Sequence, residues 1–208
     1  MTLKTDFKKE IAAYSAKSGR FDIVDVPALR YLMIDGHGDP NTGAFTDATG
    51  ALYPLAYRLK FAAKKLGRDH VVMPLEGLWW SGDMTAFTAA RDKSRWDWTL
   101  MIMVPDWVDD EMFAGAGGGS SAVRLATLAE GRCVQTLHVG SYDDEAETLA
   151  RMHDEFIPAN GLRMTGKHHE IYLSDARRVA PGKLRTILRQ PVEAVTAAVP
   201  ARPASMPG

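Results

Sequence analysis

Two similar stretches decide the fold: residues 78–83 read LWWSGD and residues 170–175 read EIYLSD. Their identities match loosely. The order of the surrounding elements, however, is the same in both halves. A strand pattern and a helix pattern come before each stretch, and a further strand pattern comes after it. This repeated order of elements is the stronger argument. The sequence therefore predicts an α+β fold built from duplicated β-α-β-β units.

The first unit contains a long helix pattern between strand patterns. Leu52, Leu55 and Leu59 recur with helical spacing and predict a stripe that faces the core. Pro54 lies within this pattern, so the helix is expected to start or kink there. The elements expected in this unit are a strand at 28–35, a helix at 45–66, and strands at 70–80 and 95–104.

The second unit repeats the order with a shorter helix. Ser141 is a suitable N-cap, and Asp143, Asp144 and Glu145 fall in the first turn, where the helix dipole favours acidic residues. The helix is expected to end before Pro158. The elements expected in this unit are a strand at 133–139, a helix at 141–156, and strands at 168–173 and 184–189.

A chain of 208 residues is long enough for one sizeable core and short for two domains. Residues 1–20 are expected to form a loosely docked leader. Residues 21–192 are expected to form a single domain, with pseudo-repeats at about 21–105 and 122–192. The four glycines within 115–119 have no phosphate-loop context and predict a mobile connector. Residues 193–208 are rich in Ala and Pro and predict a disordered tail.

The overall charge and the cysteine content narrow the possible partners and compartment. A formal net charge of −1 gives no electrostatic case for nucleic acid or an anionic membrane as a partner. The single cysteine, Cys133, rules out an internal disulfide and fits a reducing compartment. The N-terminal residues lack the apolar core of a signal peptide. We therefore expect a cytoplasmic protein.

Glu170 is the residue most suggestive of function. Side chains alternate along a strand, so Ile171 and Leu173 are expected to face the helices, and Glu170 and Tyr172 the opposite face. If that face lines a cup, the carboxylate lies beside an aromatic ring away from bulk water. A carboxylate in such a place has a raised pKa, or it needs a cationic or hydrogen-bonding partner. Either property suits it to recognise a ligand or to act as a general acid or base. The alternative is an exposed glutamate paired with a surface arginine such as Arg189.

Aromatic residues offer walls for a planar ligand. All five tryptophans fall between residues 79 and 107, and the neighbours at 79 and 80 must point to opposite faces of a strand. Tyrosines at 53 and 57 lie on one helix stripe. Core packing is the alternative for any one of these rings. The residues expected to line the cup are Tyr53, Trp79, Trp80 and Trp98, with Tyr57 and Tyr172 as candidates for catalysis beside Glu170.

The sequence does not predict a metal or cofactor site. The neighbours His168 and His169 would face opposite sides of a strand, and no HxxxH pair or Cys/His cluster is present. Cys133 lies in a predicted buried strand and is expected to be structural. Ser81 and Ser141 lack the surroundings of a catalytic serine. No cofactor is expected.

Eight short blocks occur in the order found in one known family. They are DVP (25–27), MIDG (33–36), GDPN (38–41), ALYPLAY (51–57), PLEGLW (74–79), GSYDDE (140–145), HEIYLSD (169–175), and RRVAP (177–181) running on to LRTILRQPV (184–192). With these blocks the chain resembles the GyrI-like small-molecule-binding family, which includes gyrase-inhibitor-like and AraC effector-binding-like domains. The resemblance covers nearly the whole of residues 21–192.

The resemblance implies antiparallel sheets with helices on one side and a ligand cup between two pseudo-symmetric halves. It also implies a glutamate at the cup floor, which corresponds to Glu170. The chain carries no helix-turn-helix segment, so it resembles the stand-alone members. The blocks at 51–57, 74–79 and 184–192 look closest to a branch of cyclopropanoid hydrolases, which open the strained ring of planar DNA-alkylating compounds.

Two functions follow as hypotheses. In the first, the protein binds a planar hydrophobic ligand and hydrolyses a cyclopropanoid compound in detoxification. Glu170 then acts on the attacking water, and Tyr57 or Tyr172 hydrogen-bonds the carbonyl oxygen that becomes a phenolate. In the second, a non-catalytic module senses or sequesters hydrophobic, often cationic, drugs, and Glu170 is a counter-charge. The expected partner is a small planar hydrophobic or cationic ligand. A homodimer is also possible. A third hypothesis, inhibition of gyrase by direct contact, would need an acidic surface that mimics DNA, and a net charge of −1 does not support one.

Overall fold

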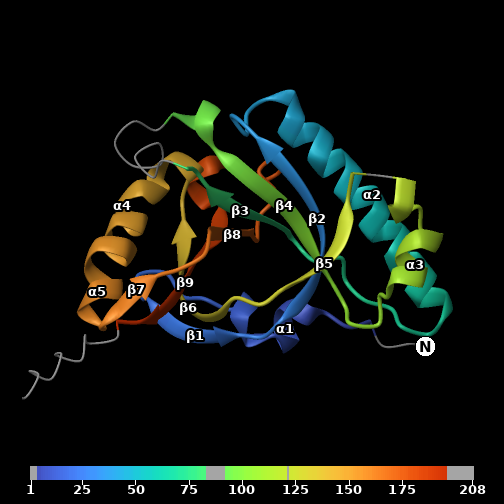
Figure 1. Ribbon diagram of the computed structural model, residues 1–208, viewed down its shortest axis with the longest axis horizontal. Helices are drawn as coiled ribbons and strands as arrows, with labels where there is room; N and C mark the ends of the chain where they lie inside the picture. The colour runs from blue at the N-terminus through green and yellow to red at the C-terminus, as the bar shows by residue number, and fades with distance from the viewer. Residues whose placement is uncertain (1–3, 83–91, 121, 196–208) are drawn as a thin grey trace, which may run out of the picture.

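Antiparallel pairing joins the strands of this computed structural model into one large sheet, with helices packed against it (Figure 1). The structure describes residues 4–82, 92–120 and 122–195. Within these residues eight strands follow the order β1-β6-β9-β8-β3-β4-β2-β5, and the ninth, β7, pairs with β9. The strands are β1 (Asp22–Val26), β2 (Leu29–His37), β3 (Leu75–Trp80), β4 (Asp97–Val104), β5 (Arg124–Leu128), β6 (Gly131–Val139), β7 (Leu162–Met164), β8 (His168–Tyr172) and β9 (Arg185–Ala194).

The helices fall between the strands in the repeated order that the sequence predicts. Helix α2 follows β2, and a second helical stretch, whose middle is a π-helix, follows β6. The helices are α1 (Phe7–Glu10), α2 (Gly43–Lys65), α3 (Asp110–Gly115), α4 (Glu145–Ala150), the π-helix η6 (Arg151–Phe156) and α5 (Ile157–Ala159). Helix α2 begins at Gly43, close to the expected 45–66, and continues through Pro54, so of the start or kink expected at the proline the start does not occur.

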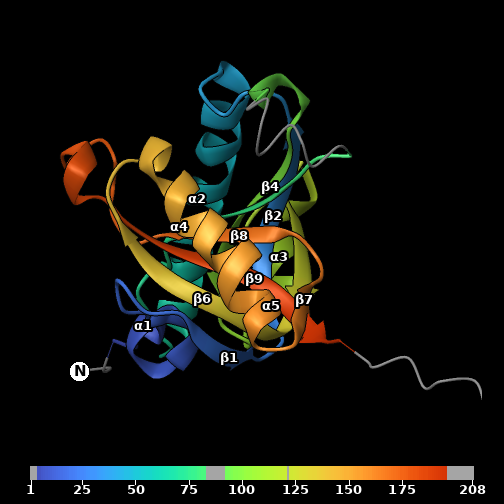
Figure 2. The same cartoon turned by 90° about the vertical axis from the view of Figure 1, so that its left-hand side faces the viewer.

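The duplicated β-α-β-β fold is confirmed by the order of strands in the sheet. The first unit, β2-α2-β3-β4, contributes the neighbours β3-β4-β2, and the second, β6-α4-β8-β9, contributes β8-β9-β6. The two units meet where β3 pairs with β8, and the order is symmetric about this seam. Helix α2 lies at one end of the sheet and α4–α5 at the other (Figures 1 and 2).

Both helical stretches pack on the same face of the sheet, here called the helix face. Trp79 and His168 are paired across the seam, so their side chains share a face. Phe45 of α2 stacks on Trp79 with ring centroids 6.3 Å apart. His153 of η6 meets His168 edge-on at 6.0 Å. The seam between the two units is therefore flanked by a helix from each unit.

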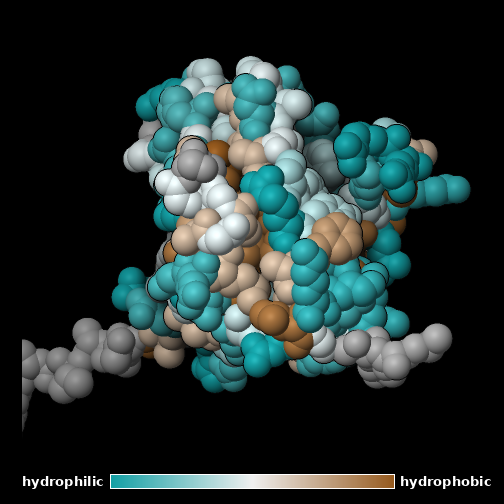
Figure 3. Space-filling model, turned by 90° about the vertical axis from the view of Figure 1, so that its right-hand side faces the viewer, coloured by the Kyte–Doolittle hydropathy of each residue, from teal (hydrophilic) through white to brown (hydrophobic). Residues whose placement is uncertain are grey.

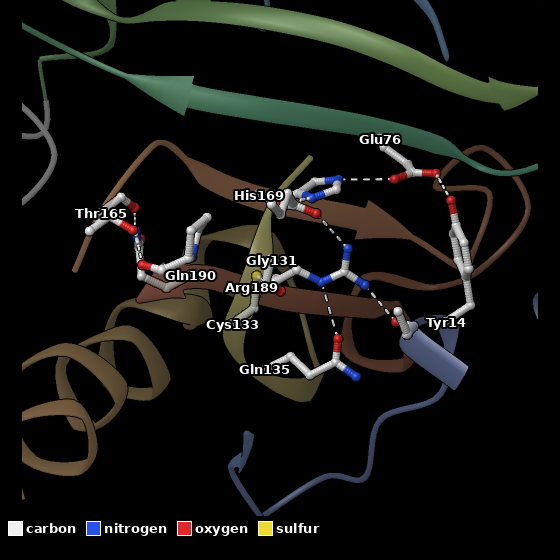
Figure 4. A network of polar contacts seen from close by, with 12 residues as sticks. Tyr14, Glu76, Gly131, Cys133, Gln135, Thr165, His169, Arg189 and Gln190 are labelled. Carbon is white, nitrogen blue, oxygen red and sulfur yellow. Dashed lines mark hydrogen bonds and ion pairs between the residues drawn. The ribbon is translucent and has the colours of Figure 1, made fainter. Parts of the chain in front are cut away.

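The other face of the sheet, the open face, carries a buried polar network that the N-terminal segment helps to cover (Figure 4). The hydroxyl of Tyr14 donates to Glu76 over 2.6 Å, and Tyr14 is only 4% exposed. Arg189 donates to the carbonyl oxygen of Ala13 and to Gln135. The N-terminal segment is thus docked into the core, and the expectation of a loosely attached leader is wrong.

Several elements were not expected from the sequence. They are the short strands β1, β5 and β7, whose pairing partners are distant in the chain. The glycine-rich stretch begins with Gly115, the last residue of α3, and runs into a 3₁₀ turn at Gly118–Ser120. Strand β9 continues to Ala194, so the folded body is longer than the expected limit of 192, while residues 196–208 lie outside the described part. In the described ranges no helix is long and apolar enough to cross a membrane.

Candidate functional site

Glu170 lies at the centre of the sheet, where the two units meet. Its strand β8 runs between β3 and β9, and Glu170 is paired with Gly77 on β3 and Leu188 on β9. Because Gly77 and Trp79 share a side of β3, Glu170 faces the helices. The prediction that Glu170 and Tyr172 face away from the helices is therefore wrong. Ile171 pairs with Glu76 on the open face, where the buried network covers it instead of a helix.

A chain of hydrogen bonds joins the carboxylate of Glu170 to two aromatic residues. The indole Nε1–H of Trp79 donates to the hydroxyl oxygen of Tyr172 over 3.1 Å. The same hydroxyl donates to Oε2 of Glu170 over 2.8 Å. Gly77 makes room for this arrangement, since a Cβ there would lie 2.7 Å from Trp79 Nε1 and 3.1 Å from the Tyr172 hydroxyl. The geometry thus orients one oxygen of the carboxylate, Oε2.

Burial sets the protonation of this carboxylate. It raises the pKa of Glu170 from 4.5 to about 7, although the hydrogen bond from Tyr172 and the nearby His169 both act to lower it. About 15% of the side chain is still exposed, so the carboxylate is not sealed from a ligand. A carboxyl group that titrates near neutral pH can exchange protons under physiological conditions.

Two histidines on the helix face keep their neutral form. His168, two residues before Glu170, places Nε2 3.6 Å from Oε1 of the carboxylate. Burial lowers the pKa of His168 to about 3, so the contact is not an ion pair at neutral pH. Burial also lowers the pKa of His153 on the π-helix. Glu170 is therefore not neutralised by either histidine, and the site remains suited to a cation.

Tyr142 and Glu145, at the start of the second helical stretch, complete the surroundings. The ring of Tyr142 meets that of Tyr172 edge-on at 5.6 Å. Glu145 is 4% exposed and lies near enough to help raise the pKa of Tyr172. The sequence patterns assigned Glu145 only to the helix dipole, and His168 entered only as a metal ligand that was rejected. Strand alternation could have found His168, because residues 168 and 170 must share a face.

Trp79 lies in a group of aromatic rings beneath α2. Besides Phe45, it contacts Trp96 edge-on at 5.8 Å. Trp98 contacts Phe45 at 5.9 Å and is 1% exposed, because its ring lies directly on the backbone of Gly36. Trp98 is consequently a core residue that supports the site and not a lining residue.

The other predicted aromatic residues are dispersed. Trp80 points to the open face, where the ammonium of Lys167 lies 3.0 Å from its ring centroid. Tyr53 is half-buried on α2, whereas Tyr57 is 47% exposed and contacts Phe61. The structure therefore brings together Glu170, Tyr172 and Trp79, and it does not bring Trp80 or Tyr57 to them. Among residues 4–82, 92–120 and 122–195, no group of three His, Cys, Asp or Glu side chains could hold a metal ion.

Comparison with known proteins places this arrangement in a family. The model of the GyrI-like small molecule binding domain matches residues 20–193. The chain belongs to this GyrI-like family. Glu170 lies on the helix face at the seam between the two β-α-β-β units of this GyrI-like domain. No curated protein matches the chain.

Solved structures resemble this GyrI-like domain over almost its full length. An uncharacterized conserved protein from Listeria innocua is 39% identical, with a TM-score of 0.83 over 91% of this chain and 100% of that chain. A hydrolase from Listeria innocua is 37% identical, with a TM-score of 0.79 over 92% of this chain and 100% of its own. The C-terminal domain of EcmrR, 11% identical with a TM-score of 0.56, covers 85% of this chain and 98% of that domain and shares the fold.

Proposed function

We propose that the protein binds a planar hydrophobic ligand at Glu170 and hydrolyses strained cyclopropanoid DNA-alkylating compounds. The observation that carries the proposal is the chain Trp79–Tyr172–Glu170, which holds a partly buried carboxylate at the seam between the two units. The similarity to a protein described as a hydrolase supports an enzymatic role.

The proposed reaction needs one water molecule and one base. Water forms a bond to the strained ring carbon, the carbon–carbon bond of the cyclopropane breaks, and its electron pair moves through the ring system to the carbonyl oxygen, which becomes a phenolate. Ionised Glu170 takes the proton that the water loses. A pKa of about 7 suits this role, because a base is most effective when its pKa lies near the working pH. Trp79 is 5% exposed and packs between Phe45 and Trp96, so it supports the site from behind by holding the hydroxyl of Tyr172.

A non-catalytic module that senses or sequesters drugs is the second candidate. It is favoured by the electrostatics of the site, in which His168 and His153 are held neutral beside Glu170. A hydrophobic cation would find one carboxylate there, with neither His168 nor His153 charged beside it.

Analysis of reaction products separates the two candidates. The protein is incubated with a cyclopropanoid compound, and the products are examined by mass spectrometry. A hydrolase yields the substrate plus one water, at a rate proportional to enzyme concentration. Recovery of intact compound bound to the protein supports the second candidate.

Replacing Trp79 by Ala should weaken binding of a planar hydrophobic ligand by about 1–3 kcal/mol, because the site loses the buried ring behind it and the hydrogen bond that orients Tyr172. The change can be measured by isothermal titration calorimetry on protein shown to be folded by its thermal unfolding. Trp80 provides the matched control, since it is adjacent in sequence but points to the open face. Trp80→Ala should leave the affinity unchanged, and the reverse result would show that the ligand lies on the wrong face for this proposal.

A further inference from the structure

A cavity of about 530 Å³ opens on the face of the sheet opposite Glu170. Its floor includes Met33 and Leu78, which are buried, and its walls include Leu128 and Pro191. Neither Glu170 nor Tyr172 lines it. The volume is within the range of small-molecule sites in proteins, which is about 300–1,000 Å³. The space is therefore large enough for a ligand and separate from the site described above.

Of the residues that the structure describes, one acidic residue lines this cavity, and its charge is already matched. The carboxylate of Glu130 is 3% exposed, and its two oxygens lie 3.0 Å from His169 Nδ1 and 2.9 Å from Arg189. Arg189 is fully buried, and the neighbouring carboxylates raise the pKa of His169. Glu130 is bonded to His169 and Arg189 of the buried network, so it does not attract a cation into the cavity.

The two cations that line the cavity differ in how they are paired. Arg124 makes two bonds to Asp35, of 2.7 and 3.0 Å, and Asp35 also accepts a bond from Thr99. Lys167 lies over the ring of Trp80. Among the described residues, no carboxylate lies within ion-pair distance of Lys167; Asp35 is engaged by Arg124, and Asp97 by His37. Lys167 thus supplies one ammonium whose charge no carboxylate of the described chain neutralises directly.

An apolar floor beside one such ammonium suits a particular class of ligand. Apolar area favours a hydrocarbon or aromatic body, and the ammonium favours a single negative charge at one end. We propose that this cavity is a second ligand site, which binds an amphipathic monoanion such as an aromatic sulfonate or carboxylate. This site is independent of the function proposed for Glu170.

Two dyes that differ by one charge test the proposal. The first is 8-anilino-1-naphthalenesulfonate, and the second is N-phenyl-1-naphthylamine, which has the same rings without the sulfonate. Both are titrated into the full-length protein and followed by fluorescence. Lys167→Gln should weaken binding of the sulfonate on the order of tenfold, the effect of about one charged hydrogen bond, and leave the neutral dye unchanged. Lys167→Arg should restore binding of the sulfonate.

Controls separate this site from the rest of the protein. Lys183→Gln, at an exposed position away from the cavity, should leave the affinity for both dyes unchanged. Glu170→Gln should likewise leave the sulfonate affinity unchanged, whatever it does to turnover. An unchanged sulfonate affinity in Lys167→Gln, or an affinity that depends on Glu170 instead, would overturn the proposal without bearing on the function of Glu170.

Discussion

Glu170→Gln is expected to reduce turnover of a cyclopropanoid substrate on the order of a hundredfold or more, the scale for a lost acid–base group, while ligand binding survives. Glutamine has nearly the same shape and can still accept the hydrogen bond from Tyr172, so the site should keep its geometry. It cannot take a proton from the attacking water. The comparison requires kcat from product formation and a separate affinity from calorimetry.

The outcome also separates the two proposed functions. A pure binding module should lose affinity for cations in Glu170→Gln and keep affinity for neutral ligands. Glu147→Gln is the matched control, because Glu147 is exposed on α4 and lies outside the site. Unchanged turnover together with unchanged cation affinity in Glu170→Gln would reject both functions and make Glu170 an ordinary residue of the sheet.

Arg189→Met should lower the free energy of unfolding by about 3–5 kcal/mol, the cost of removing one partner from a buried ion pair. Arg189 is fully buried and donates to Glu130, Gln135 and the carbonyl oxygen of Ala13. Methionine fills similar space but leaves these acceptors without a donor. The loss should appear in urea unfolding as a lower midpoint at an unchanged m-value.

An exposed ion pair provides the control for Arg189→Met. Arg163 pairs with Glu193, and both side chains are at least half exposed. Arg163→Met should change the free energy of unfolding by at most about 1 kcal/mol, as is usual for surface pairs. Equally small losses in both variants would show that the open-face network contributes little to stability.

Strand alternation predicted which side chains share a face but not which face they occupy. It correctly placed Glu170 beside Tyr172 and separated Trp79 from Trp80. It assigned the apolar Ile171 to the helices, on the assumption that only one face of the sheet is buried. Both faces are covered at the seam, by helices on one side and by the Glu76 network on the other, so hydrophobicity could not distinguish them.

The remaining differences come from contacts between residues distant in the chain. Tyr57 lies on the predicted helix stripe, but the packing of α2 leaves it exposed. Trp98 is buried because Gly36 of the neighbouring strand lets its ring approach the backbone, and no local spacing shows this. Hydrophobic residues on the face that carries α2 and α3 occur in small groups among hydrophilic ones (Figure 3). The residue patterns and the resemblance together predicted the order of elements and the importance of Glu170. Which side chains contact Glu170 depends on how the strands pair in the sheet.

The central claim is that Glu170 is a partly buried carboxylate that meets the ligand, and its own titration tests this most directly. The ¹³C resonance of the Glu170 carboxyl carbon can be followed from pH 4 to 9 by NMR, and assigned by its absence in Glu170→Gln. Burial predicts a pKa of about 7 in the free protein, so Glu170 is protonated below that pH and ionised above it. A bound planar cation should lower this pKa, and its affinity should rise as the pH rises through about 7. A pKa near the ordinary 4.5 that does not move when the cation binds would contradict the account.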